Sequence, residues 1–339
     1  MQLISSLRQA GYNLRALRIV DDRGRRVGGF DTSRFGRVLH QRYLSILRGD
    51  LAAEIYAALE GQVETLFGES IRALDEDKTG VDVQFDRSAP RRFGLVVGAD
   101  GLHSAVRRLI FAPQLGQEVY LGYCAAAFAV DGYPHRDADV YVAYCEPGKQ
   151  VARFTLRDGR TVFFLVFALE EKPAIGHHDS AHQREILDRV LAGAGWESPE
   201  IRRALQHSGD VYFDVVSQIR LDEWHCGRKV LIGDAAFCPS LLAGQGSSLA
   251  MASAFVLAGE LWRAGGDFGT AYPAYQALMK PLIDRKQRQA AGFARQFAPR
   301  TALGLAVRNA LSRLLGVPLI GDLMVKRMFA DSLKLPEYS

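Results

Sequence analysis

Two segments of this sequence place an aspartate directly after an apolar run. VVGADG covers residues 96–101, and VLIGDA covers residues 230–235. Such runs predict buried strands, and ligands of open α/β sheets bind beyond the carboxyl ends of the strands. We therefore expect Asp100 and Asp234 at a ligand crevice, where a carboxylate would accept hydrogen bonds from ribose or ribityl hydroxyl groups. The alternative for Asp100 is a local role as the cap of the helix that follows.

Glycines near both aspartates would let a ligand approach the backbone closely. Gly101 and Gly233 adjoin the two aspartates, and a Gly-x-Gly loop follows the second. This loop comprises Gly244, Gln245 and Gly246. A flat ring could stack on it, and the next helix, which we expect Ser247 or Ser248 to cap, would favour negative charge on that ring. An ordinary glycine loop is the alternative, because Gly-x-Gly alone is a weak signal.

Local patterns predict the elements that position these residues. Three segments are predicted to be helices: 3–11, 48–61 with Asp50 as its N-cap, and 183–206. A further helix is expected to begin after Ser104 as its N-cap. Strands are expected over 14–21, 25–31 and 63–68, and residues 75–85 resemble a β-hairpin. Residues 95–97 are continuously apolar, as in a central strand that is covered on both faces.

The middle of the chain has a different pattern. Four apolar segments between residues 123 and 169 are separated by turns rich in Gly, Pro and Asp, and a fifth follows at 209–219. This pattern predicts an antiparallel sheet. We expect it to form an inserted substrate-binding domain over residues 117–220. Residues 1–116 and 221–339 would then form a discontinuous α/β, Rossmann-like domain that ends in helices.

Composition excludes several classes of protein. The net charge is only +4, and the Arg-rich stretch 23–48 lacks the interleaved aromatic residues of a nucleic-acid-binding surface. No apolar run is long enough to span a membrane, there is no signal-peptide pattern, and the four cysteines form no C-x-x-C pair. These features predict a reduced, cytoplasmic protein. His178 and His182 have metal-ligand spacing, but no third ligand accompanies them, so we expect no metal.

The two aspartate segments together resemble one family. GADGLHSAVR is similar to the Asp-Gly motif, and RKVLIGDAAFCPSLLAGQG to the Gly-Asp motif, of single-component FAD-dependent monooxygenases of the para-hydroxybenzoate hydroxylase type. SILRGDLAAEIYAAL adds a third match, in which Arg48 falls on an arginine that contacts the flavin nucleotide in that family. The resemblance runs from about residue 5 to residue 300. It implies an FAD-binding domain with an inserted substrate domain.

The resemblance also implies a function. NAD(P)H would reduce FAD, O₂ would form a flavin C4a-hydroperoxide, and one oxygen atom would pass to an aromatic or polycyclic substrate. The implied cofactor-binding residues are Arg48, Asp100, Gly101, Gly233, Asp234, Gly244, Gln245, Gly246 and Ser247; no residue is assigned a catalytic role. Five aromatic residues of the sheet suit such a substrate, although core packing would also explain them: Phe128, Tyr141, Phe163, Phe164 and Phe213.

The sequence departs from the family pattern in three places. It contains no G-x-G-x-x-G phosphate loop, so we expect a chain that lacks the family's first βαβ unit. Phe237 and Leu241 stand where members often have His and Pro. Two alternatives to a monooxygenase therefore stay open: a non-catalytic remnant of the fold, which would bind no FAD, and a flavin-dependent reductase, which would consume NAD(P)H without O₂.

Overall fold

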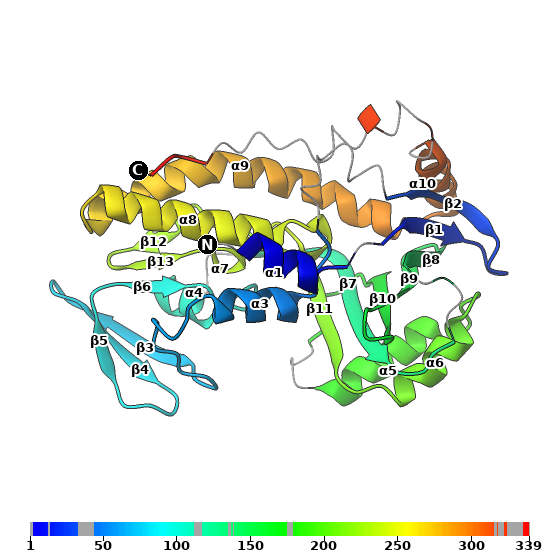
Figure 1. The fold of residues 1–339 in the computed structure, drawn as a ribbon, viewed down its shortest axis with the longest axis horizontal. Helices are drawn as coiled ribbons and strands as arrows, with labels where there is room; N and C mark the ends of the chain where they lie inside the picture. Colours follow the sequence, from blue (N-terminus) through cyan, green and yellow to red (C-terminus); the bar gives the residue numbers. More distant parts are fainter. Residues whose placement is uncertain are drawn as a thin grey trace. The chain divides into compact units, whose positions relative to one another are not determined.

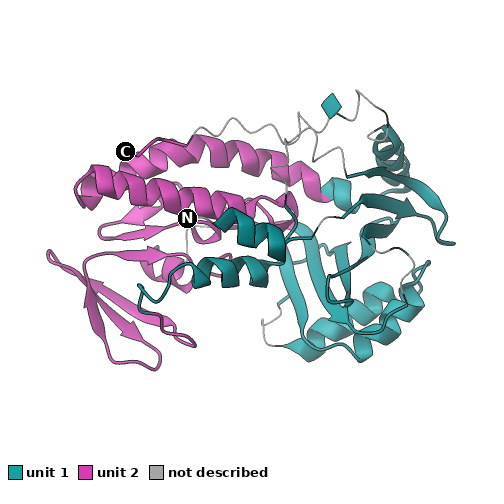
Figure 2. Ribbon diagram, in the orientation of Figure 1, with its two compact units in different colours: residues 1–64, 122–215, 295–331 teal, residues 65–121, 216–294, 332–339 magenta. Residues whose placement is uncertain are grey.

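The computed structural model describes residues 3–12, 14–32, 44–111, 117–134, 137, 139–174, 179–314, 317, 322–323 and 335–338. The chain divides into two compact units (Figure 2). Unit 1 comprises residues 1–64, 122–215 and 295–331, and unit 2 comprises residues 65–121, 216–294 and 332–339. The expected sheet domain, 117–220, resembles the central part of unit 1. The division differs from the expectation because both ends of the chain, 1–64 and 295–331, group with that part.

The main sheet explains this difference (Figure 1). Its strand order is β11-β7-β10-β9-β8-β1-β2. The strands are β1 (Ala16–Val20), β2 (Arg26–Asp31), β7 (Glu118–Val130), β8 (Val140–Glu146), β9 (Lys149–Thr155), β10 (Thr161–Ala168) and β11 (Val211–Ile219). The middle strands β7 to β10 are antiparallel, as predicted, whereas β1 joins β8 in parallel. Long-range pairing of this kind leaves no local pattern in the sequence.

The two faces of the sheet differ in burial, because successive side chains of a strand point to opposite faces. Phe163 of β10 pairs with Phe128 and Arg153, and these three side chains are buried on one face. On the other face Phe164, which pairs with Ala127 and Ala152, is half-buried, whereas Ala152 and Val166 are buried. We call the first the covered face and the second, which is exposed only in part, the open face.

Helices of unit 1 follow the predicted segments with two differences. They are α1 (Leu3–Ala10), α3 (Arg48–Ala57), α5 (Ser180–Leu191), α6 (Ser198–Gln206) and α10 (Ala302–Leu314). The expected helix 183–206 is divided, because the positive φ angles of Gly193 (72°) and Trp196 (57°) are incompatible with a continuous helix. Asp50 lies in the first turn of α3, whose N-cap is Leu47, so its predicted capping role is wrong.

Unit 2 combines two small sheets with helices. One sheet is β3 (Ile71–Glu76), β4 (Val81–Phe85) and β5 (Arg91–Phe93); the other has the order β12-β13-β6, from β12 (His225–Cys226), β13 (Lys229–Leu231) and β6 (Val96–Gly98). The helices are α4 (Ala105–Ile110), α7 (Asp234–Phe237), α8 (Gly246–Arg263) and α9 (Phe268–Phe297). One apolar core joins these elements, with Trp224, Phe237 and Tyr275 fully buried.

Two further strand predictions were wrong. Residues 63–68 form turns and irregular backbone. Strand β6 is not covered on both faces, because Val97 is 44% exposed. The strand stands last in its sheet order, so the apolar run of residues 95–97 did not mark a central position.

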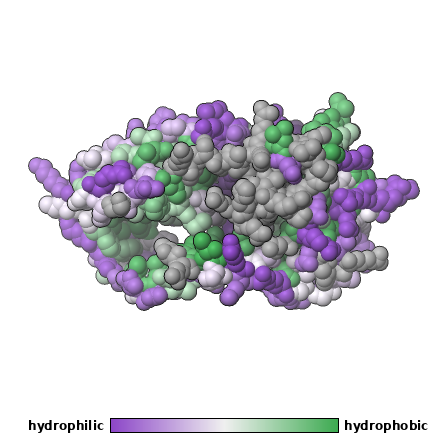
Figure 3. All heavy atoms as spheres, turned by 45° about the horizontal axis from the view of Figure 1, so that its top comes forward, coloured by the Kyte–Doolittle hydropathy of each residue, from purple (hydrophilic) through white to green (hydrophobic). Residues whose placement is uncertain are grey.

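No helix in the described parts of the chain is long and apolar enough to cross a membrane. On the face that Figure 3 shows, hydrophobic and hydrophilic side chains are interspersed.

Candidate functional site

The two aspartate segments lie next to each other in unit 2. Strands β6 and β13 are parallel, and Gly98 is the register partner of Leu231. The N–H of Ile232 donates to the carbonyl of Gly98 (2.9 Å), so the pairing continues to the strand ends. Asp100 and Asp234 therefore leave the same edge of the sheet, at the carboxyl ends where α/β folds bind ligands. The structure brings together the two residues that the sequence singled out.

Asp100 also has a local role. The hydroxyl of Ser104 donates to its Oδ1 (2.5 Å) and the N–H of Val106 to its Oδ2 (3.0 Å). Ser104 is the predicted N-cap of α4, since its Oγ accepts from the N–H of Arg107 (2.8 Å). The carboxylate is nonetheless exposed, and two oxygens offer about four acceptor positions. Asp100 can therefore stabilise the turn and, at the same time, accept a hydrogen bond from a ligand hydroxyl group.

A sharp turn presents Asp234. Gly233 adopts a φ of 57°, and its N–H donates to the Oγ of Ser253 in α8 (3.2 Å). A β-carbon at Gly233 would lie 3.0 Å from that of Ala250, so this position needs glycine for space as well as conformation. The turn places the half-buried Asp234 in the first residue of α7.

The loop before α8 differs from its prediction in one respect. Helix α8 begins at Gly246, and its N-cap Gln245 makes no side-chain capping hydrogen bond, so the predicted capping by Ser247 or Ser248 is wrong. Ser247 is exposed in the first turn. Because the first backbone amides of a helix have no partner within the helix, this end can bind a polar or anionic group. Asp234 faces it, with Oδ1 3.5 Å from the point where a β-carbon of Gly246 would lie.

The backbone of this loop is held in unusual conformations. Gly244 is left-handed (φ 65°), and the buried Ser240 has a φ of 139°, which is rare for a residue with a side chain. The side-chain amides of Gln218 and Gln287 donate to the Pro239 carbonyl (2.8 Å) and the Phe237 carbonyl (3.1 Å). Strained backbone that its surroundings fix in this way is common at ligand sites.

The two residues that depart from the family pattern differ in position. Phe237 is buried in the core against Trp224, with 4.8 Å between ring centroids. Leu241 is half-buried in the one-turn helix Leu241–Ala243.

Arg48 belongs to unit 1. It lies in the first turn of α3. Burial raises the pKa of Tyr212 in β11, and the nearby Arg48 opposes that rise. Its predicted contact with a flavin nucleotide stays a prediction.

The five aromatic residues predicted for the substrate divide between the two faces. Phe128 and Phe163 are buried on the covered face, with 5.1 Å between ring centroids, and Phe213 is buried against Phe167 (6.0 Å). These three belong to the core. Tyr141 and Phe164 are half-buried on the open face, and Phe154 and Tyr12 extend the row by stacking: Tyr141–Phe154 5.9 Å, Tyr12–Phe154 6.0 Å.

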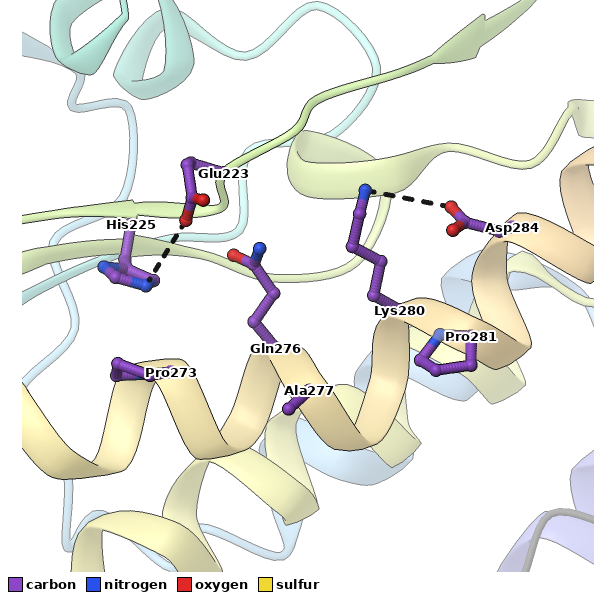
Figure 4. A pocket seen from close by; sticks show the side chains of 8 residues that line it. All are labelled: Glu223, His225, Pro273, Gln276, Ala277, Lys280, Pro281 and Asp284. Carbon is purple, nitrogen blue, oxygen red and sulfur yellow. Dashed lines mark ion pairs between the residues drawn. The ribbon is translucent and has the colours of Figure 1, made fainter.

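A separate surface hollow of about 650 Å³ lies between the β12 segment and α9 (Figure 4). Its ionisable side chains lie next to one another in two pairs: His225 with Glu223 (3.7 Å) and Lys280 with Asp284 (3.8 Å). Lys280 also donates to the carbonyl of Leu221 (2.9 Å). Because these side chains already have partners within the hollow, it offers less to a ligand than the aspartate edge does.

The described residues contain no cluster of three or more His, Cys, Asp or Glu side chains that could hold a metal ion. His178 lies outside the described residues. Nδ1 of His182 in α5 lies 3.7 Å from Oδ2 of Asp179.

Arg107, which the sequence analysis did not single out, is buried beside both aspartate loops. The signal that could have identified it is a basic residue on the helix face that follows a strand–Asp–Gly turn.

A model of the FAD-binding-domain family matches residues 49–265, which contain both aspartate segments and the α8 loop. The chain belongs to this family of FAD-dependent monooxygenases. A flavin-dependent monooxygenase of Legionella longbeachae is 31% identical over 268 residues, 75% of this chain and 67% of that protein. An uncharacterized protein of Mycobacterium tuberculosis is 33% identical over 288 residues, 85% of this chain and 77% of that protein.

Solved structures agree with this assignment. The crystal structure of the tetracycline destructase Tet(55) matches with a TM-score of 0.80 and 27% identity, covering 99% of this chain and 84% of that one. Klebsiella pneumoniae HpxO, crystallised with FAD and uric acid, has the same fold, with a TM-score of 0.77, 23% identity and coverage of 98% and 84%. The α/β FAD-binding fold with helices near the C-terminus is confirmed, and FAD is the cofactor of the family.

Proposed function

We propose that the chain binds FAD at the carboxyl ends of β6 and β13. The residues present fit the ribityl chain and ring of this cofactor. Asp100 and Asp234 provide acceptors for sugar or ribityl hydroxyl groups at one sheet edge. Gly101 and Gly244 have positive φ angles, and a β-carbon on either would meet no atom within 4 Å, so the backbone there is open to a ligand. The single observation that carries the proposal is the parallel β6–β13 pair, which brings both aspartates to one edge.

Gly233 in the turn before α7 also belongs to the proposed site, and Gln245, Gly246 and Ser247 at the N-terminus of α8 complete it. Bound FAD would accept a hydride from NAD(P)H and supply activated oxygen from O₂ to an electron-rich substrate. Around it, the partial positive charge of the α8 N-terminus would stabilise negative charge on the reduced ring. Asp234 would hold a hydroxyl group beside that helix end, and thereby orient the ring. Arg48 is proposed as a further cationic contact to the nucleotide, on the resemblance of its segment to the family.

The proposed substrate is an aromatic or polycyclic small molecule on the open face of the sheet. The half-buried rings of Tyr141, Phe154 and Phe164 offer stacking surfaces. Relatives support this class, since Tet(55) is named a tetracycline destructase and HpxO was crystallised with uric acid. Residues 117–220 would thus contain most of the substrate domain, with FAD bound by residues of 1–116 and 221–339.

The test combines a flavin spectrum with oxygen consumption. FAD is titrated into the purified protein, and NADH or NADPH is then added with a panel of phenols, purines and polycyclic aromatics. We expect a flavin absorbance band, substrate-stimulated O₂ uptake, and isotope from heavy O₂ in the product. NAD(P)H oxidation with a reduced organic product and no O₂ uptake would instead identify a reductase, and failure to bind FAD would identify a non-catalytic protein.

A further inference from the structure

We propose that Arg107 is a positioning residue that fixes the two aspartate loops relative to each other. Its guanidinium donates to the carbonyl of Leu102, in the loop of Asp100, and to the carbonyl of Ala235, directly after Asp234. The inference rests on the proposed FAD site, because it concerns the residues assigned to that site. The mobility of the two loops, however, can be measured by hydrogen–deuterium exchange without cofactor.

The two hydrogen bonds connect segments far apart in the sequence. Nη2 of Arg107 lies 2.6 Å from the Leu102 carbonyl oxygen, and Nη1 lies 2.9 Å from the Ala235 carbonyl oxygen, 128 residues along the chain. The residue is only 5% exposed, so water competes little for these bonds. One planar side chain therefore bridges the loops after β6 and β13.

The backbone of Arg107 strengthens the connection to Asp100. Its N–H donates to Ser104 Oγ (2.8 Å), and the Ser104 hydroxyl in turn donates to Asp100 Oδ1 (2.5 Å). Arg107 thus joins the Asp100 carboxylate, through Ser104, to the backbone that carries Asp234. A displacement of either loop would have to break at least one of these bonds.

An arginine is costly at this position, and that cost favours a specific role. Burial lowers the pKa of Arg107, while the nearby Asp100 carboxylate acts in the opposite direction. Its buried Nε has no hydrogen-bond partner among the described residues. The planar fork of a guanidinium can bond two carbonyl groups at once, which a lysine ammonium does less well and an apolar side chain cannot do.

Arg108 offers a matched control. It follows Arg107 in α4 and is exposed, and its Nη1 donates to the carbonyl of His103 (2.6 Å), in the first loop only. Arg108→Met removes the same charge and a hydrogen bond of the same type. It leaves the connection to Ala235 intact.

The experiment compares Arg107→Met, Arg107→Lys and Arg108→Met with the unchanged protein. Hydrogen–deuterium exchange without cofactor should rise in both loops, 98–104 and 233–240, in Arg107→Met, but at most in the first loop in Arg108→Met. The FAD dissociation constant of Arg107→Met should rise roughly ten- to a hundredfold, because small misplacements of binding groups have effects of this size. The visible circular dichroism of the bound flavin should change as well. Arg107→Lys should give loop exchange and an FAD dissociation constant between those of Arg107→Met and the unchanged protein. If Arg107→Met does not fold, the Arg107→Lys values test the positioning role.

Unchanged exchange at 233–240, or an unchanged FAD dissociation constant with only a lower unfolding temperature, would overturn the positioning role. If the unchanged protein binds no FAD, the proposed function fails, whereas the exchange result still shows whether Arg107 connects the loops.

Discussion

The carboxylate of Asp234 faces Gly246, with Oδ1 3.5 Å from the point where a β-carbon of that glycine would lie. Gly246 is the first residue of α8, so a side-chain acceptor and the donor end of a helix occupy the same small region. An acceptor and a donor side by side can bind a ligand that presents both hydroxyl and carbonyl groups, as the ribityl chain and ring of a flavin do.

Gly246→Val should weaken flavin binding and slow flavin reduction without unfolding the protein. The added methyl groups would extend into the space between the helix end and the Asp234 carboxylate. Overpacking of this kind costs about 1–3 kcal/mol, or roughly ten- to a hundredfold in affinity. FAD titration and stopped-flow reduction by NAD(P)H measure the effect. Gly246→Ala, whose β-carbon meets Asp234 at ordinary contact distance, is the control; normal reduction in the valine variant would show that the ring lies elsewhere.

Phe163→Ala and Phe164→Ala should have different effects, although they are neighbours in β10. Phe163 is completely buried beside Phe128 and Tyr133, so its removal should lower the free energy of unfolding by about 3–5 kcal/mol. Phe164 lies half-buried on the open face and should mainly raise the KM for an aromatic substrate. Chemical denaturation and steady-state kinetics distinguish the two. An unchanged KM in Phe164→Ala would argue against the open face as the substrate site.

Tyr338 should stabilise unit 2 by packing over Gly259 of α8, where a β-carbon would collide with its ring. Its hydroxyl donates to Glu260 Oε1 (2.7 Å), and the guanidinium of Arg263 lies over the ring (4.8 Å). Tyr338→Phe should cost about 1 kcal/mol of unfolding free energy through the lost hydrogen bond, and Tyr338→Ala should cost more. Thermal unfolding checks this order, with Glu337→Ala as the control; three equally stable variants would contradict the contact.

Glu76 should make stability depend on pH in the acid range. Burial opposes its ionisation, but hydrogen bonds from Lys229 and the Arg228 N–H (2.8 Å) outweigh it and lower the pKa below the ordinary 4.5. A lowered folded-state pKa adds stability that is complete above 4.5 and is lost as pH falls through the folded value. The difference in unfolding free energy between the unchanged protein and Glu76→Gln should therefore shrink as the pH falls below 4.5. Asp75→Asn is the control, and a pH-independent difference would contradict the account.

The local parts of the site were predictable from the sequence, because each depends on a few adjacent residues. The strand–Asp–Gly turn and the Ser104 cap are of this kind. The start of α8 was not, since Gln245 ends the loop without a capping side chain and the serines that follow suggested a later start. Residue type alone could not show which of Phe163 and Phe164 faces the core, because that depends on sheet register.

Tertiary features were less predictable. The exposure of Val97 follows from the position of β6 in its sheet, and the parallel pairing of β1 with β8 joins residues more than a hundred positions apart. The buried bridge from Arg107 to Ala235 is of the same long-range kind. A single sequence shows the residues that take part in such contacts but not their partners.

The most direct test of the account compares FAD binding by Asp234→Ala and Asp222→Ala. Asp234 follows β13 at the proposed site, whereas Asp222 lies exposed in a bend earlier in unit 2. A lost charge-assisted hydrogen bond is worth about 1.5–3 kcal/mol, or roughly ten- to a hundredfold in affinity. Titration followed by flavin fluorescence should show that loss in Asp234→Ala and an unchanged dissociation constant in Asp222→Ala. Equal FAD affinities in the two variants would contradict a flavin site at the carboxyl ends of β6 and β13.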